Sequence, residues 1–325
     1  MILGKSVGAV IIGRNEGERL LRCLASLPDT IDHTVYVDSG STDGSIEAAR
    51  AKGAKVVSLD MATPFTAARA RNAGFAKLLE SRKLDFVQFI DGDCELREGW
   101  VELAIHFMLK TPEAAVACGR RRERFAEASV YNRLCDWEWN TPIGQTKSCG
   151  GDALIRSVSF EEVRGFNPSL IAGEEPELCL RLRAKGWQIW RLDHEMTWHD
   201  AAITQFSQWW KRNRRSGYAF AEGAKIHGAP PERHWVRQTQ RIAVWGILIP
   251  ILIMAAALLL SFWCLFGLII YPLQTARIAR REGGSKVAWE VAIFWVLGIF
   301  PQAVGVLEFW RKHLWDGNVK IIEYK

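Results

Sequence analysis

The sequence predicts an α/β domain with a mostly parallel sheet, followed by helices that insert into a membrane. Short apolar runs alternate with helical patterns in the first third of the chain, at 7–12, 34–37, 54–59 and 85–90. This β-α-β-α order is typical of a parallel sheet with helices on both faces. Two long apolar stretches follow at 242–273 and 287–310, and the first holds 32 residues without a charged side chain. Because a helix needs about 20 apolar residues to cross the hydrocarbon, these stretches predict membrane insertion.

Each element of the first half has its own local signal. Four leucines between 20 and 27 fall on one helical face after the first apolar run. Ser41-Thr42-Asp43 follows the second run and offers a hydroxyl or carboxylate as the cap of a helix that runs to 51. An Ala- and Leu-rich helix over 66–80 precedes the fourth run. Later patterns predict helices over 129–139 and 175–185 and a Gly-rich polar loop over 145–152.

The net charge of +6 is distributed unevenly along the chain. Arg and Lys gather at 120–124, 211–215 and 277–286, and the last two clusters border the apolar region. This pattern favours a surface that faces anionic lipid or a diphosphate. Because no nucleic-acid recognition motif accompanies the charge, we expect no nucleic-acid partner.

Cysteine usage and the first residues indicate the compartment. The seven cysteines show neither metal-finger spacing nor a disulfide framework, so we interpret them as reduced thiols. No secretory signal opens the chain, since residues 1–5 lead directly into an apolar run. We therefore expect a protein of the inner (cytoplasmic) membrane whose large domain faces the cytoplasm.

Asp91-Gly92-Asp93 directly follows the apolar run that ends at Ile90. Side chains at i and i+2 of an extended segment point to the same side, so both carboxylates emerge at the carboxyl edge of the predicted strand. Ligands of such sheets bind beyond this edge, where Asn15-Glu16 and Asp38-Ser39 also follow strands. The carboxylates suit Mg²⁺ or Mn²⁺ held against a diphosphate. Alone, the triplet also fits an ordinary surface turn.

Five motifs in a fixed order carry a family resemblance. They are Ile11-Ile12-Gly13-Arg14-Asn15-Glu16, Val37-Asp38-Ser39-Gly40-Ser41-Thr42-Asp43, Ala70-Arg71-Asn72-Ala73-Gly74, Asp91-Gly92-Asp93 and Gly173-Glu174-Glu175. Over about residues 5–225 this order resembles family 2 of the inverting glycosyltransferases, which have the GT-A fold. The resemblance implies a transferase of the hexosyltransferase type that uses a UDP- or GDP-sugar.

The resemblance also implies which residues bind the donor and the metal. The donor-binding residues would be Asn15, Glu16, Asp38, Arg71, Asn72 and Asp91. Asp38 alternatively fits a helix cap, and Arg71 fits a solvated helix face. Asp91 and Asp93 match the pair that holds a divalent cation on the diphosphate. Such a cation neutralises the charge that the departing nucleoside diphosphate gains.

An inverting transfer needs a general base that takes the proton of the acceptor hydroxyl. Gly173-Glu174-Glu175 stands where the family usually carries Glu-Asp, and Glu175 occupies the Asp position. We therefore expect Glu175 to be the base. Because Glu is one methylene longer than Asp, Glu174 remains an alternative candidate for the base. A purely structural alternative is that these acidic residues stabilise the start of a helix through its dipole.

Residues farther along complete the predicted site. Asp152 follows two glycines and resembles the segment that contacts the donor sugar and the acceptor. His199 is expected as a third metal ligand or an acceptor contact, although a structural histidine is equally compatible. Arg212 and Arg215 share a helix face and would hold donor phosphate or lipid headgroups.

These features divide the chain into a glycosyltransferase domain at 1–230 and a membrane-associated region at 231–325. Basic residues flank both apolar stretches, which favours hairpins or re-entrant pairs over simple spans, with breaks at Pro250 and Pro301. Membrane anchoring of a sugar transferase suggests a polyprenyl-linked acceptor in surface polysaccharide or glycolipid assembly. The Gln-x-x-Arg-Trp motif of processive synthases is absent, which favours addition of a single sugar.

Two other functions remain open at this point. A sugar nucleotidyltransferase would share the strands and carboxylates, but it normally shows an early Gly-rich phosphate loop that Gly13-Arg14-Asn15 does not supply. A non-catalytic membrane-anchored assembly module would carry the carboxylates only by accident.

Overall fold

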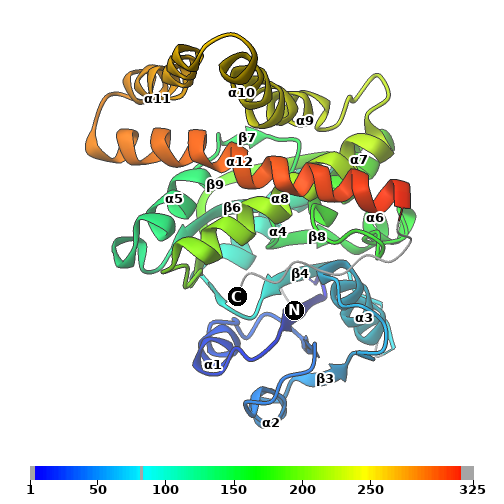
Figure 1. The fold of residues 1–325 in the computed structure, drawn as a ribbon. Helices are drawn as coiled ribbons and strands as arrows, with labels where there is room; N and C mark the ends of the chain where they lie inside the picture. The colour runs from blue at the N-terminus through cyan, green and yellow to red at the C-terminus, as the bar shows by residue number, and fades with distance from the viewer. Residues whose placement is uncertain (1–3, 81–82, 316–325) are drawn as a thin grey trace. The chain divides into compact units, whose positions relative to one another are not determined.

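A computed structural model describes residues 4–80 and 83–315. The described residues form two compact units (Figure 1). The first unit is Met1–Ala128 with Cys135–Ala202, and the second is Ser129–Leu134 with Ile203–Lys325. The prediction that no secretory signal opens the chain concerns residues 1–3 in part, and these lie outside the described residues. The functional division at residue 230 stays a prediction.

The first unit is built on a mixed sheet with nine strands in the described residues. Its order is β3-β2-β1-β4-β8-β6-β9-β5, and β7 pairs with β9. The strands are β1 (Val7–Gly13), β2 (His33–Asp38), β3 (Lys55–Ser58), β4 (Phe86–Asp91), β5 (Cys94–Leu96), β6 (Ala114–Glu123), β7 (Gly144–Gln145), β8 (Ala153–Arg156) and β9 (Gln188–His199). The strands β3, β2, β1 and β4 are parallel, whereas β8 is antiparallel to both β4 and β6.

Helices follow the strands as the alternating pattern predicts. They are α1 (Glu18–Ala25), α2 (Ser45–Ala51), α3 (Ala67–Leu79), α4 (Trp100–Lys110), η1 (Ala126–Ala128), α5 (Val130–Glu138), α6 (Ser157–Glu162) and α7 (Glu174–Ala184), and α5 continues across the boundary between the units. A Cβ at Gly74 of α3 would lie 2.4 Å from Val10 Cγ1 and 2.9 Å from Val37 Cγ2. Glycine therefore allows α3 to approach β1 and β2 closely.

The second unit consists mainly of helices. They are α8 (Phe206–His227), α9 (Val236–Ala243), the π-helical η2 (Val244–Leu248), α10 (Ile249–Leu259), the 3₁₀ helix η3 (Phe262–Ile269), α11 (Ile270–Arg281) and α12 (Lys286–Trp315). Two glycines bring α8 and α12 together, because a Cβ at Gly217 would lie 2.0 Å from Gln302 O and one at Gly305 would lie 2.0 Å from Arg214 O.

Three helical segments of the described chain are long and apolar enough to cross a membrane, judged by length and composition alone: Val236–Leu259, Phe262–Arg281 and Lys286–Leu314. The first apolar stretch does form a hairpin, but the expected break at Pro250 is wrong. Pro250 directly follows the π-helical η2 and lies inside a helix that runs without a break from Val236 to Leu259, and the chain turns at Leu260 and Ser261. Pro301 also ends no helix, since it lies inside α12.

The first four strands and the helices between them match their predicted ranges within a few residues. The helices α5 and α7 are confirmed as well. The sequence patterns did not reveal the strands β6, β8 and β9, which complete the sheet. Mixed pairing and three register shifts between β6 and β9 explain this, because they interrupt simple alternation.

Candidate functional site

Polar residues lie side by side at the carboxyl ends of the neighbouring strands β1, β2 and β4. In the sheet register Gly13 pairs with Asp38 across β1 and β2, and Ile12 pairs with Asp91 across β1 and β4. The Gly92 amide also donates to Ile12 O at 2.8 Å. A Cβ at Gly92 would lie 3.2 Å from both that carbonyl and Glu16 Cγ, so Glu16 packs over the triplet.

Arg71 of α3 links two carboxylates of the predicted site. Its Nη2 donates to Asp91 Oδ1 and its Nη1 donates to Glu174 Oε1, each at 2.7 Å. The Arg71 side chain is only 3% exposed. Burial alone would lower the pKa of this guanidinium, but the charges of Asp91 and Glu174 outweigh burial and raise it. Arg71 is therefore a permanent cation that joins the end of β4 to the start of α7.

Arg121 of β6 forms a second ion pair beside Arg71. Its Nη2 lies 2.9 Å from Asp152 Oδ2 and 4.0 Å from Asp91 Oδ2. Asp152 is fully buried, and it also accepts from the Asp91 amide at 3.0 Å and from Thr197 Oγ1 at 2.9 Å. The carboxylates again outweigh burial and raise the pKa of Arg121. Asp152 thus fixes the position of Asp91 through its backbone.

Gly151 leaves little space between the two guanidinium groups. A Cβ there would lie 3.1 Å from Arg121 Nη2, 3.2 Å from Arg71 Nη2 and 3.2 Å from Asp91 Oδ2. The Gly-rich loop therefore passes directly over this charge cluster. Its contact with the donor sugar stays a prediction.

Asp93 and His199 face each other at the ends of neighbouring strands. Cys94 of β5 pairs with His199 of β9, and His199 Nε2 lies 3.4 Å from Asp93 Oδ1. On the other side of the ring, Nδ1 lies 3.6 Å from Glu123 Oε2. The Trp139 ring packs edge-on against the imidazole at 4.8 Å between centroids. Ligand atoms of Asp93, Cys94 and His199 all lie within 4.8 Å of one another.

Glu175 lies in a buried pocket next to two cysteines. One of its carboxylate oxygens, Oε1, accepts from the backbone amide of Cys149 and from Cys179 Sγ, the latter at 3.1 Å. The two sulfurs are 3.7 Å apart. Burial raises the pKa of the Cys179 thiol to about 11, and Glu175 adds to this rise although Cys149 opposes it. The thiol therefore stays protonated and donates to the carboxylate.

Asn15 and Asp38 hold the loops that follow β1 and β2. Asp38 is buried, and its Oδ2 accepts from the amides of Gly40 and Ser41 at 2.8 and 3.0 Å. Asn15 has a positive φ of 55°, and its Oδ1 accepts from the Thr42 amide at 2.7 Å. These contacts order the loop that would surround a nucleoside.

Asn72 and the two arginines of α8 have different surroundings. Asn72 holds the backbone of Phe166, donating to its carbonyl at 2.7 Å and accepting from its amide at 2.9 Å. Arg212 and Arg215 lie three residues apart on α8 in the second unit, as the helical spacing predicts. Their contact with donor phosphate stays a prediction.

Two residues that the sequence did not single out belong to this cluster. Arg121 stands in the basic run 120–124, whose other members form ion pairs within the first unit: Arg120 and Arg122 with Asp136, and Arg124 with Glu95. Glu123 stands in the same run and accepts from the amides of Phe125 and Ala201. No local signal set Arg121 apart from its neighbours, because register shifts interrupt the alternation of β6 on either side of Arg120.

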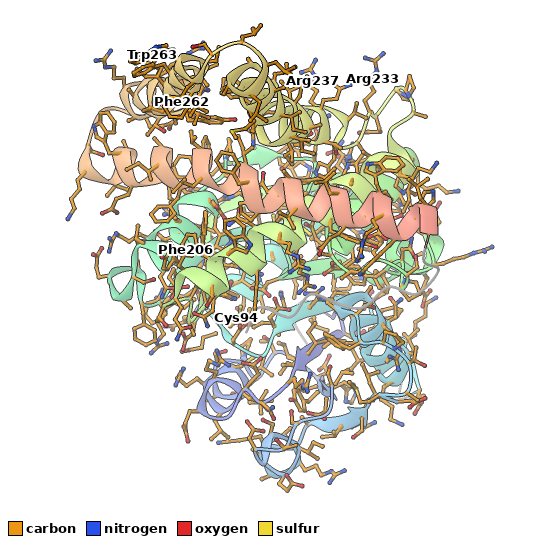
Figure 2. The ribbon with its side chains drawn as sticks, viewed as in Figure 1. Cys94, Phe206, Arg233, Arg237, Phe262 and Trp263 are labelled. Atoms are coloured by element: carbon orange, nitrogen blue, oxygen red, sulfur yellow. The ribbon has the colours of Figure 1, made fainter. Side chains whose placement is uncertain are left out.

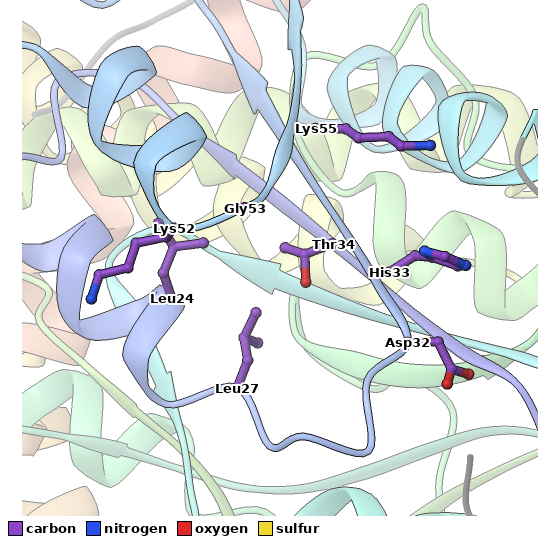
Figure 3. Close-up of a pocket in the computed structure, with 8 residues that line it drawn as sticks. All are labelled: Leu24, Leu27, Asp32, His33, Thr34, Lys52, Gly53 and Lys55. Atoms are coloured by element: carbon purple, nitrogen blue, oxygen red, sulfur yellow. The ribbon is translucent and has the colours of Figure 1, made fainter.

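A cavity of about 180 Å³ lies elsewhere in the first unit (Figure 3). It is lined by Leu24, Leu27, Asp32, His33, Thr34, Lys52, Gly53 and Lys55. His33 and Lys55 begin β2 and β3, so the cavity lies at the amino ends of these strands. It is therefore separate from the charge cluster at the carboxyl ends.

Comparisons with known proteins agree with this geometry. Residues 9–156 match the model of the family described as Glycosyl transferase family 2. A TPR repeat-containing protein of Synechococcus elongatus is 36% identical over 146 residues, which are 44% of this chain and 34% of that protein. The pre-mycofactocin glycosyltransferase of Mycobacterium tuberculosis is 26% identical over 326 residues, which are 96% of this chain and 65% of that protein. The chain thus spans about a third and about two thirds of the lengths of these relatives.

Solved structures share the fold over nearly the whole chain. A mannosyltransferase from Pyrobaculum calidifontis, solved in complex with GDP-Man and Mn²⁺, superposes with a TM-score of 0.65 at 17% identity, covering 97% of this chain and 88% of its own. S. aureus TarS 1–349 gives a TM-score of 0.51 at 14% identity, covering 95% and 92%. Residues 9–156 of this chain are therefore similar to the Glycosyl transferase family 2 domain, and the fold is GT-A.

Proposed function

We propose that this protein transfers one sugar from a UDP- or GDP-sugar to a lipid-linked acceptor at the membrane, with inversion at the anomeric carbon. The observation that carries the proposal is the convergence of Asp91, Asp93, Asp152, Glu174 and His199 at one sheet edge of a family 2 domain. The similarity to a glycosyltransferase along 96% of the chain supports it. Neither alternative function explains a family 2 match that includes Asp91, Asp93 and Asp152 of this cluster.

The residues around Asp93 fit a divalent cation. Asp93 Oδ1 and His199 Nε2 lie 3.4 Å apart, so one ion between them would contact both. Glu123 faces the other ring nitrogen, which is the usual arrangement for a histidine that binds metal. A carboxylate and an imidazole suit Mn²⁺, and the carboxylates suit Mg²⁺. A bound cation would neutralise the diphosphate as it leaves.

Arg71 and Asp152 arrange the donor side of the site. Arg71 compensates the charge of Asp91, which otherwise would repel the donor diphosphate. Asp152 holds the Asp91 backbone and lies beside Gly151, so this loop is placed to contact the donor sugar. Asn15 and Asp38 order the loops that we assign to the nucleoside.

Glu175 would act on the acceptor side. In the reaction the acceptor oxygen forms a bond to the anomeric carbon, the bond to the diphosphate oxygen breaks, and Glu175 takes the acceptor proton. Glu174 is less suited to this role because its carboxylate pairs with the Arg71 cation, whereas Glu175 accepts from the uncharged Cys149 amide and Cys179 thiol. Cys179 and the Cys149 amide hold Glu175 by one oxygen and so fix the direction of the carboxylate.

The second unit supports the proposal of a lipid-linked acceptor and of a membrane location. Its apolar helices and their basic flanks support association with an anionic membrane surface, which we assign to the cytoplasmic face of the inner membrane. A protein held there meets acceptors whose lipid part never leaves the bilayer. A polyprenyl-linked carrier used in polysaccharide or glycolipid assembly has this property.

Membranes that contain the protein should be incubated with radiolabelled UDP- and GDP-sugars and Mn²⁺, and the lipids then extracted. We expect label in the lipid phase, absent with the Glu175→Gln variant. Label that appears only in water-soluble product would contradict the lipid acceptor.

A further inference from the structure

The helices α10 and η3 form a hairpin within the second unit (Figure 1). A Cβ at Gly267 of η3 would lie 3.2 Å from Ile253 Cγ1 of α10, so the two helices pack closely at this point. At the base of the hairpin, Tyr271 Oη donates to Trp245 O at 2.6 Å, and the Tyr271 ring packs against Phe300 of α12. The base of the hairpin therefore packs against α12. The turn at Leu260 and Ser261 forms the other end of the hairpin.

The turn of the hairpin presents large apolar side chains to its surroundings. Those between 71% and 82% exposed are Leu258, Leu259, Leu260, Phe262 and Trp263. Such a continuous exposed apolar group is unusual in a water-soluble protein. In Figure 2, Phe262 and Trp263 lie well apart from Arg233 and Arg237 of the same unit. The apolar turn and the basic flank thus occupy different ends.

Backbone groups at the turn find partners inside the hairpin. The amides of Leu260 and Ser261 donate to Ala256 O at 2.9 and 3.2 Å, and the Cys264 amide donates to Ser261 O at 2.9 Å. Ser261 Oγ accepts from the Trp263 amide. Because hydrocarbon offers no hydrogen bonds, this internal satisfaction is what a turn inside a bilayer requires.

The dimensions of the hairpin match one leaflet. The helix continues without a break from α9 through η2 into α10, and a Cβ at Gly246 of η2 would lie 2.7 Å from Ala303 Cβ of α12. Beyond this contact the eleven residues of α10 rise about 17 Å at 1.5 Å per residue, and the eight residues of η3 return about 16 Å at 2.0 Å per residue. Half of the hydrocarbon thickness is about 15 Å. The hairpin would therefore reach the middle of the bilayer and would not cross it.

The contacts of α12 argue against its crossing the bilayer, although its length and composition would permit it. Arg214 Nε of α8 donates to Glu308 Oε2 at 2.8 Å, and Arg133 Nε donates to Glu290 Oε2 at 3.0 Å. The partner helix α8 carries a cluster of charges at 211–215. Burying this helix pair in hydrocarbon would be costly. The outer face of α12 is apolar, including Trp289, which suits a helix that lies in the plane of the interface.

We propose that the α10–η3 hairpin inserts into a single leaflet, while α9, α11 and α12 lie along the headgroup surface. Basic residues flank the hairpin on both sides and would contact anionic headgroups: Arg237, Arg241, Arg277, Arg280, Arg281 and Lys286. The partner of this surface is thus an anionic lipid bilayer. This topology rests on the membrane association proposed above. In it, none of the three helical segments that are long and apolar enough to cross the bilayer does so.

Cys264 is a native probe of this topology, because the other described cysteines are buried. The full-length protein is reconstituted into phosphatidylethanolamine–phosphatidylglycerol vesicles and treated with a membrane-impermeant maleimide on either face. We expect Cys264 to react only after detergent is added. Lys286→Cys in a Cys264→Ser background is the control and should react without detergent on one face. An environment-sensitive fluorophore attached at Cys264 should be quenched more by 12-doxyl than by 5-doxyl lipid.

Two results would overturn the topology. Reaction of Cys264 from the face opposite Lys286→Cys would show a span, and reaction from the same face without detergent would show no insertion. These measurements do not depend on sugar transfer, so a protein that inserts but transfers no sugar would contradict only the proposed function.

A matched pair of substitutions tests the turn itself. Leu259→Lys places a charge at the turn, whereas Val158→Lys makes the same kind of change at an exposed position of α6 in the first unit. We expect Leu259→Lys to lower the fraction that co-sediments with the vesicles at least tenfold and Val158→Lys to leave it unchanged. Equal binding of both variants would contradict insertion of the turn.

Discussion

The buried Arg71 and the partly exposed Asp91 form an ion pair, with 2.7 Å between Nη2 and Oδ1, at the end of the strand that leads into the proposed metal-binding motif. The same guanidinium reaches Glu174, the first residue of α7. One cation thus connects the donor side of the site with the helix that presents Glu175. A donor-binding role was expected for Arg71, and the geometry adds a positioning role.

Loss of the Arg71 cation should destabilise the first unit. In Arg71→Met the carboxylates of Asp91 and Glu174 would remain partly buried without their cation, which typically costs about 3–5 kcal/mol. Urea unfolding of the full-length protein in detergent, followed by Trp fluorescence, measures this. Lys77→Met on the same helix removes an exposed pair with Glu80 and should cost at most about 1 kcal/mol. An equal loss of unfolding free energy in the two variants would show that the Arg71 ion pairs contribute no more to stability than an exposed pair.

Glu175 and Glu174 should differ in the step that their substitution impairs. Glu175→Gln removes the proposed base, so kcat should fall by a factor of about 10²–10⁴ with the donor KM nearly unchanged. Glu174→Gln removes a partner of Arg71 and should mainly weaken donor binding. Steady-state kinetics of both variants separate these effects. Undiminished turnover in Glu175→Gln would refute the assignment of the base.

Glu123 should affect metal binding although it does not touch the ion in our proposal. Its Oε2 lies 3.6 Å from His199 Nδ1, and we expect it to accept a hydrogen bond from this nitrogen when the metal is bound. Glu123→Gln should weaken Mn²⁺ binding about 10–100-fold, as the electron paramagnetic resonance signal of free Mn²⁺ would show. Glu127→Gln, four residues away in η1, is the control and should bind Mn²⁺ like the wild type. Wild-type affinity in Glu123→Gln would argue against His199 as a ligand.

Asp85 should make stability depend on pH below about 4. Burial acts to raise its pKa, but hydrogen bonds from Ser6 and the Lys5 ammonium outweigh burial and hold the pKa below the usual range. Stability from this carboxylate is therefore present above the unfolded pKa of about 3.9 and is lost as pH falls through the folded value. The urea midpoint of Asp85→Asn should lie below that of the wild type at pH 7, and the gap should close towards pH 3. A gap that does not change with pH would contradict this.

The sequence predicted the parts of the site that depend on local order. Asp91 and Asp93 could be placed because a buried strand directly precedes them and the side-chain period of a strand is two. Glu174 and Glu175 could be placed because they open an amphipathic segment. These features need no knowledge of distant contacts.

The remaining parts depend on strand pairing that no local pattern encodes. His199 meets Asp93 only because β9 pairs antiparallel with β5, and Arg121 meets Asp152 only because β6 lies between β8 and β9. The basic run around Arg121 predicted a surface that faces anionic lipid or a diphosphate, and its ion pairs stayed hidden because the acidic partners are distant in the sequence. The turn at Ser261 was equally hidden, because prolines were the stronger local signal for a break.

Release of nucleoside diphosphate by the purified full-length protein is the most direct test of the proposed metal-dependent transfer. A panel of UDP- and GDP-sugars is incubated with the protein and Mn²⁺, with and without a chelator. We expect release from at least one donor that is abolished by the chelator and by Asp93→Ala. Release that persists in Asp93→Ala with the chelator present, or no release from any donor in the panel, would contradict a metal-dependent glycosyltransferase.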